Sequence, residues 1–146
     1  MIFELSLTGV LVVEDDWLIA AEIVDALASA GIGTLGPANS VSAALDIIAA
    51  NEPHAIGAAI LDVRLGQETV EPVAAALAAR GVPFVYATGR VWQKGDAVDQ
   101  VAPRLVKPID LRHLVEVLRT LTASRALTPV LLPTASSPWS AIAAAA

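Results

Sequence analysis

The sequence predicts an α/β domain, a doubly wound, five-stranded parallel sheet with helices on both faces. Three observations predict it. Short apolar runs alternate five times with segments of helical spacing, which is the order of repeated βα units. Residues 56–61 form an apolar run without charge, as expected of a strand buried on both faces. Polar residues follow these runs directly, Glu14 after the first and Asp62 after the third.

The first half of the chain contains two predicted strand–helix units. Residues 10–13 are apolar and β-branched, and helical spacing then begins at Trp17, with Asp16 as a reasonable N-cap. This helix runs to residue 30, and Gly31 suits the position just beyond its end.

The second unit begins with residues 34–36, which predict a short strand closed by Pro37. An alanine-rich helix follows, opened by Ser40 or Ser42 and ended by residues 51–53.

The second half contains three more predicted units. After the strand at 56–61, a helix is expected over residues 69–80, because Pro72 is tolerated in a first turn. The fourth strand covers residues 82–87 and ends at Thr88.

Residues 90–103, after this strand, are irregular and predict a loop or a stunted helix. Residues 105–106 predict a short strand, and residues 111–121 an amphipathic final helix.

Length and composition limit the number of domains and the classes of function that the chain can have. Residues 1–122 fit one domain, and the proline- and serine-containing residues 123–146 predict a tail outside the fold. No apolar run is long enough for a transmembrane helix and no secretory signal is evident, so a cytoplasmic protein is the default. The absence of cysteine excludes disulfides and thiolate chemistry. The net charge of −6 argues against nucleic-acid binding.

The carboxyl ends of parallel strands meet at one rim of a sheet, and the predicted rim collects Glu14, Asp15, Asp62, Thr88 and Lys107. Each residue has a simpler interpretation. Asp62 alone is equally well read as a helix N-cap, the two preceding acids favour a helix N-terminus, and Thr88 stands in a turn-like Thr-Gly pair. Together, however, the carboxylates would repel one another unless a cation such as Mg²⁺ lay between them. The set suits phosphoryl transfer, with Asp62 as nucleophile and Lys107 and Thr88 contacting phosphoryl oxygens.

These motifs resemble the receiver domain of two-component response regulators over residues 8–122. The resemblance is carried by Leu11-Val12-Val13-Glu14-Asp15-Asp16, Ile60-Leu61-Asp62, Ala87-Thr88-Gly89 and Leu105-Val106-Lys107-Pro108. It implies a flavodoxin-like fold with strand order 2-1-3-4-5, here with a reduced fourth helix.

The resemblance also implies roles for individual residues. Asp62 is the implied phosphoacceptor, and Thr88 and Lys107 are the implied switch residues. The implied Mg²⁺ ligands are Glu14, Asp15, Asp62 and the backbone carbonyl of Arg64. The implied partners are a histidine kinase or histidine phosphotransfer protein and a downstream protein. The chain would then be a signalling module or a phosphate sink rather than an enzyme, and homodimerisation is allowed.

Two departures from the family pattern bear on signalling. Residues 82–89 resemble the Phe-Ala-Thr-Gly-Tyr group of receivers, often single-domain proteins, but Tyr86 and Arg90 replace two aromatic residues of that motif. Arg104 stands where receivers usually carry the aromatic residue that couples to the threonine. We therefore expect the segment of residues 90–103, with Trp92, to respond to phosphorylation instead.

Two other functions are also compatible with the sequence. A haloacid-dehalogenase-like phosphatase also uses a strand-end aspartate with Mg²⁺, but such enzymes have a second aspartate where this chain has Arg64. A receiver-like module that binds a partner without phosphorylation is the other alternative.

Overall fold

The computed structural model describes residues 9–89 and 102–127, in which strands and helices alternate. The main sheet is made of β1 (Gly9–Val13), β2 (Gly33–Ala38), β3 (Ile56–Asp62), β6 (Phe84–Thr88) and β7 (Arg104–Val106). The helices are α2 (Trp17–Ser29), α3 (Val41–Ala50), α4 (Glu71–Ala79) and α5 (Leu111–Leu127), with a short 3₁₀ turn at Pro53–Ala55.

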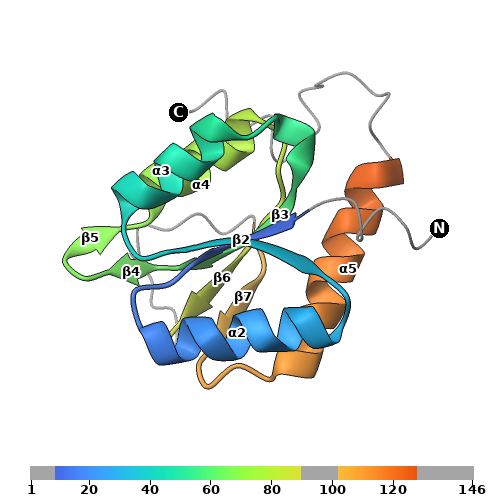
Figure 1. The fold of residues 1–146 in the computed structure, drawn as a ribbon, viewed down its shortest axis with the longest axis horizontal. Coiled ribbons are helices and arrows are strands. Elements are labelled where there is room, and N and C mark those ends of the chain that lie inside the picture. The colour runs from blue at the N-terminus through green and yellow to red at the C-terminus, as the bar shows by residue number, and fades with distance from the viewer. Residues whose placement is uncertain (1–8, 90–101, 128–146) are drawn as a thin grey trace.

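The five strands lie in the order β2-β1-β3-β6-β7 and all pair in parallel. Counted along the chain within this sheet, that order is 2-1-3-4-5, so the predicted fold is confirmed. Figure 1 shows α3 and α4 on one side of the sheet and α2 and α5 on the other. The carboxyl ends of the strands therefore share one rim, as parallel pairing requires.

The two faces of the sheet bury two separate apolar cores. Alternation along β1 shows the division: Leu11 and Val13 pack with α3 and α4, whereas Val10 and Val12 pack with α2 and α5. All seven residues of β3 are buried, including the terminal Asp62. The central strand thus carries its carboxylate to the rim from a fully covered position.

The first residues of most helices were predicted correctly from local features of the sequence. The Asp16 carboxylate caps α2 by accepting the N–H groups of Leu18 and Ile19, and the Ser40 hydroxyl caps α3 by accepting that of Ala43. Gly31, just past α2, adopts φ +77° as predicted. These caps use residues within three positions of the helix start, which is why sequence reasoning finds them.

The boundaries of three predicted strands need correction. The second strand does not close at Pro37 but continues to Ala38. It tolerates the proline because β2 lies at the edge of the sheet, where one side of the backbone needs no ladder partner. The fourth strand begins at Phe84 rather than at residue 82, and it includes Thr88. The fifth strand is one residue longer than expected and begins at Arg104.

The helix expected from residue 69 begins at Glu71 instead. The residues between β3 and this helix form a small antiparallel hairpin of β4 (Arg64–Leu65) and β5 (Glu68–Thr69). Figure 1 shows the hairpin projecting beside the sheet, beyond α4. The sequence did not predict it, because strands of two residues are too short to show periodicity.

The final helix continues past the boundary expected at residue 122 and ends at Leu127. Residues 128–146 of the predicted tail lie outside the described residues, as do residues 90–101, which hold Arg90, Trp92 and most of the predicted reduced fourth helix. In the described parts of the chain, no helix is both long and apolar enough to cross a membrane.

Candidate functional site

Strand register brings the predicted site residues to the same rim. Val13 is the register partner of Leu61, so Glu14 and Asp62 follow on neighbouring strands. Asp62 pairs with Ala87, which places Thr88 one residue further on β6. Thr88 in turn pairs with Val106, the residue before Lys107, and the Lys107 N–H donates to the Thr88 carbonyl at 2.7 Å.

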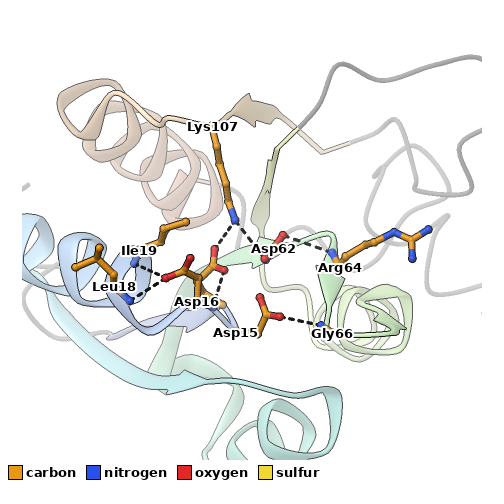
Figure 2. A network of polar contacts seen from close by, with 9 residues as sticks. Asp15, Asp16, Leu18, Ile19, Asp62, Arg64, Gly66 and Lys107 are labelled. Atoms are coloured by element: carbon orange, nitrogen blue, oxygen red, sulfur yellow. Dashed lines mark hydrogen bonds and ion pairs between the residues drawn. The ribbon is translucent and has the colours of Figure 1, made fainter.

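Lys107 lies between two of the carboxylates (Figure 2). Its Nζ is 2.7 Å from Oε2 of Glu14 and 3.2 Å from Oδ2 of Asp62. The Glu14 side chain is 1% exposed and that of Asp62 is 10% exposed. One ammonium group therefore balances two shielded carboxylates, and one negative charge is left over. The helix N-cap interpretation of Asp62 is wrong, because a hairpin rather than a helix follows it.

Burial and neighbouring charges shift the pKa of both groups in the Lys107–Asp62 ion pair. Desolvation raises the pKa of the Asp62 carboxyl from 3.8 to about 7; the neighbouring Glu14 raises it too, and Lys107 opposes the rise. Burial by itself lowers the pKa of Lys107. The contacts with Glu14 and Asp62 outweigh that effect and hold the pKa above its ordinary value of 10.5. Lys107 is thus a permanent cation beside a carboxylate that is costly to ionise.

The three consecutive acids after β1 have separate tasks. Glu14 pairs with Lys107 and its Oε1 accepts the Asp16 N–H at 3.1 Å. Asp16 itself caps α2. Asp15 is exposed, and its Oδ2 accepts the N–H of Gly66 at 2.8 Å. The simpler interpretation of Glu14 as a helix-dipole residue is not needed, since its carboxylate contacts Lys107.

A hard divalent cation fits this cluster. Glu14, Asp15 and Asp62 each offer a carboxylate oxygen, and these oxygens lie within 4.8 Å of one another. Oε2 of Glu14 is buried, and its close partner among the described residues is the Lys107 ammonium group at 2.7 Å, which leaves this oxygen with lone pairs for a cation. Oxygen ligands and surplus negative charge are what Mg²⁺ requires. The predicted acidic residues are therefore brought together as such a site needs.

The remaining predicted residues occupy the rim in different ways. Thr88 is 7% exposed at the end of β6. Arg64 begins the hairpin, its N–H donates to Oδ1 of Asp62 at 3.4 Å, and its side chain points away from the carboxylates (Figure 2).

Arg104, which stands at the position where receivers usually carry an aromatic residue, is half-buried and pairs in register with Tyr86. The Tyr86 ring is buried and packs edge-on against Phe84, with ring centroids 5.3 Å apart.

Sequence reasoning missed the backbone donors of the hairpin. The N–H groups of Arg64 and Gly66 donate to Asp62 and Asp15. Almost every residue has a backbone N–H, so the residue type gives no indication of such a donor. The one available signal was Gly66 itself, which adopts φ +63° at the start of a two-residue turn.

Solved structures similar to this chain are receiver domains and related proteins. SdrG from Sphingomonas melonis Fr1 is 40% identical with a TM-score of 0.65, and the match covers 80% of this chain and 97% of SdrG. The signal receiver domain of a modulated diguanylate cyclase from Desulfovibrio desulfuricans G20 is 28% identical with a TM-score of 0.67, over 83% of this chain and 98% of that one.

A CheY-like response regulator receiver domain protein from Methanospirillum hungatei JF-1 has a TM-score of 0.72 at 18% identity, a likeness of fold. That match covers 83% of this chain and 98% of the other. No protein-family model matches the sequence, and no curated protein does.

Proposed function

This chain belongs to the response regulator receiver domains, and on that premise we propose that Asp62 accepts a phosphoryl group from a phosphohistidine donor. The donor is a histidine kinase or a histidine phosphotransfer protein. The observation that carries the proposal is the position of Asp62, which ends a buried strand beside Glu14, Asp15 and Lys107. A nucleophile, a cation site and a fixed ammonium group at one rim are the parts that phosphoryl transfer needs.

The transfer exchanges one bond to phosphorus for another. A carboxylate oxygen of Asp62 forms the new P–O bond as the P–N bond to the donor imidazole breaks. The departing nitrogen keeps the electron pair of that bond and takes a proton from solvent. Because the carboxylate is already a nucleophile when ionised, no side chain has to act as a general base.

Charge on the phosphoryl oxygens must be stabilised during this exchange. Lys107 is held 3.2 Å from Oδ2 of Asp62, so its ammonium group already lies where that charge develops. Glu14, Asp15, Asp62 and the backbone carbonyl of Arg64 would hold Mg²⁺, which supplies Lewis-acid stabilisation of the same oxygens when bound. Thr88, at the end of the next strand, would donate its hydroxyl to one phosphoryl oxygen.

The phosphorylated domain would signal by changed contacts with a downstream protein, or act as a phosphate sink in a phosphorelay. A receiver domain that accepts its phosphoryl group from such a donor would work in the cytoplasm. A homodimer is compatible with this function, and nucleic acid is not the proposed partner because the chain has a net charge of −6.

Intact-mass measurement after incubation with acetyl phosphate and Mg²⁺ tests the proposal. We expect one phosphoryl adduct that is absent in Asp62→Asn and without Mg²⁺. Asp46→Asn is the matched control, because Asp46 is an exposed acid of α3 away from the rim, and it should keep the adduct.

Two other results would replace this function with another. Continuous turnover of a phosphomonoester without accumulation of the adduct would indicate a phosphatase of the haloacid-dehalogenase type. No adduct and no turnover, in a protein shown to be folded, would indicate a binding module that is not phosphorylated.

A further inference from the structure

The β4–β5 hairpin presents two backbone donors to the site. Arg64 is the first residue of β4, and Gly66 is the first residue of the turn that follows this strand. The N–H of Arg64 donates to Oδ1 of Asp62 at 3.4 Å, and that of Gly66 donates to Oδ2 of Asp15 at 2.8 Å. The hairpin therefore contacts two acids from different strands of the main sheet, Asp62 at the end of β3 and Asp15 after β1 (Figure 2).

Asp15 depends on this contact more than the other two acids do. Glu14 and Asp62 are buried and held by Lys107, whereas Asp15 is exposed and forms no ion pair with any described residue. An exposed carboxylate rotates among several rotamers, and ordering it costs free energy when a ligand binds. The bond from Gly66 restricts that rotation before any ligand arrives.

The hairpin is held firmly enough to act as a support. Leu65 is 3% exposed and Val70, the residue directly after β5, is fully buried, so the hairpin is anchored in the core beside α3 and α4 at Leu65 and at its base, while β5 itself is exposed. The Val70 N–H also donates to the Val63 carbonyl at 3.0 Å, which closes the hairpin at its base. Gly66 makes the turn at φ +63°, a conformation that residues with a Cβ adopt reluctantly.

We propose that Gly66 is a positioning residue for the cation site: its N–H holds the Asp15 carboxylate in place beside Glu14 and Asp62, ready to bind Mg²⁺. This inference rests on the proposed function, since it concerns the same cation. Gly66 acts through Asp15 and does not itself contact the ion. Outer partners of metal ligands commonly change metal affinity when they are altered.

Mg²⁺ affinity in glycine variants tests the role. Gly66→Ala forces a Cβ onto the turn, so the N–H should shift away from Asp15 and the Kd for Mg²⁺ by titration calorimetry should rise about tenfold. Gly81→Ala is the matched control, because Gly81 also has positive φ, +71°, and a Cβ at either glycine has no neighbour within 4 Å. It should bind Mg²⁺ like the wild type. Gly66→Asn should fall between wild type and alanine, since asparagine adopts positive φ more easily.

A measurement on the metal-free protein separates this inference from the proposed function. In ¹⁵N-labelled protein the Gly66 amide proton should move upfield in Asp15→Ala, as a hydrogen bond to a carboxylate is lost, while the Gly81 amide stays in place. An unmoved Gly66 amide overturns the contact, and equal Mg²⁺ weakening in Gly66→Ala and Gly81→Ala overturns the positioning role. A wild type whose Gly66 amide responds but which binds no Mg²⁺ overturns the cation site, and with it both proposals.

Discussion

Asp62 is the residue whose chemistry depends most on its surroundings. It ends a strand that is buried along its whole length, and that burial is the main reason its pKa rises to about 7. An aspartate in the unfolded chain has a pKa near 3.8. The folded, metal-free protein therefore binds a proton more tightly than the unfolded chain does.

The first prediction is a pH dependence of stability. Between about pH 4 and pH 7 the folded state retains a proton on Asp62 that the unfolded state has lost, so the free energy of unfolding falls as pH rises. Asp62→Asn removes this contribution. With EDTA present, the variant should match the wild type near pH 4 and exceed it at pH 8 by ~1–3 kcal/mol in urea unfolding. A constant difference across this range would contradict the raised pKa.

Lys107 offers a second prediction at the same scale. Lys107→Met keeps the aliphatic stem but leaves Glu14 and Asp62 without their cation. We expect the metal-free variant to lose ~1–3 kcal/mol of unfolding free energy, less than for a fully buried pair because the Lys107 side chain is 17% exposed. Added Mg²⁺ should reduce the loss by supplying positive charge. Arg112→Met, at an exposed cation of α5, should stay within about 0.5 kcal/mol.

Among the elements, the edge strand β2 shows how backbone geometry shapes the sheet. Its register against β1 shifts between Leu11 and Val13, and Gly36 lies at this irregularity with φ +89°. A Cβ at Gly36 would lie 2.7 Å from the Ala38 nitrogen and 3.0 Å from the Val12 carbonyl oxygen. Both are backbone atoms of the sheet, so neither can move without disturbing strand pairing.

Gly36→Ala should therefore be strongly destabilising. The positive φ alone costs about 1–2 kcal/mol, and the steric conflict adds to it, so we expect a loss above about 2 kcal/mol in chemical denaturation. Gly33→Ala in the same strand is the control, since its Cβ would have no neighbour within 4 Å and its φ is not positive. That variant should change stability by less than about 0.5 kcal/mol. Similar losses in both would show that β2 tolerates no side chain at its glycines, for a reason other than this clash.

At the scale of the whole molecule, the site connects parts of the chain that are distant in sequence. Glu14, Asp62 and Lys107 lie at or directly after the ends of three different strands, and a hydrogen bond that spans 51 residues joins Asp15 to the hairpin. Unfolding separates all of them, so a cation that needs the assembled cluster binds only the folded state. Such binding stabilises the fold by mass action.

Mg²⁺ should consequently raise the melting temperature in a saturable manner. The stabilisation should reach about 2.7 kcal/mol when the Mg²⁺ concentration is one hundred times Kd, which corresponds to several degrees for a domain of this size. NaCl at matched ionic strength should not reproduce the rise, and Asp15→Asn should reduce it. A rise of equal size in that variant, followed by differential scanning calorimetry, would show that the ion binds elsewhere.

Features that depend on near neighbours in the chain and on the βα order are predictable from the residues alone. The caps at Asp16 and Ser40 were predictable because a cap bonds N–H groups two or three residues ahead. The strand order followed from the family resemblance. The rim followed from parallel pairing, which sends the residues after β1, β3, β6 and β7 to one edge whatever the details of packing.

The role of each acid in the site depends on contacts that form only in the folded protein. Whether Glu14, Asp15 or Asp16 would contact Lys107 depends on register and on which side of the chain is buried, and three adjacent acids look alike in sequence. The hairpin and the donor at Gly66 were hidden for a related reason, since their strands are too short for periodicity and a backbone N–H is common to almost every residue. The physical reason is the separation of the partners along the chain. Local hydrogen bonds can be predicted from neighbouring residues, whereas a contact across 51 residues forms only when the sheet has placed its strands side by side.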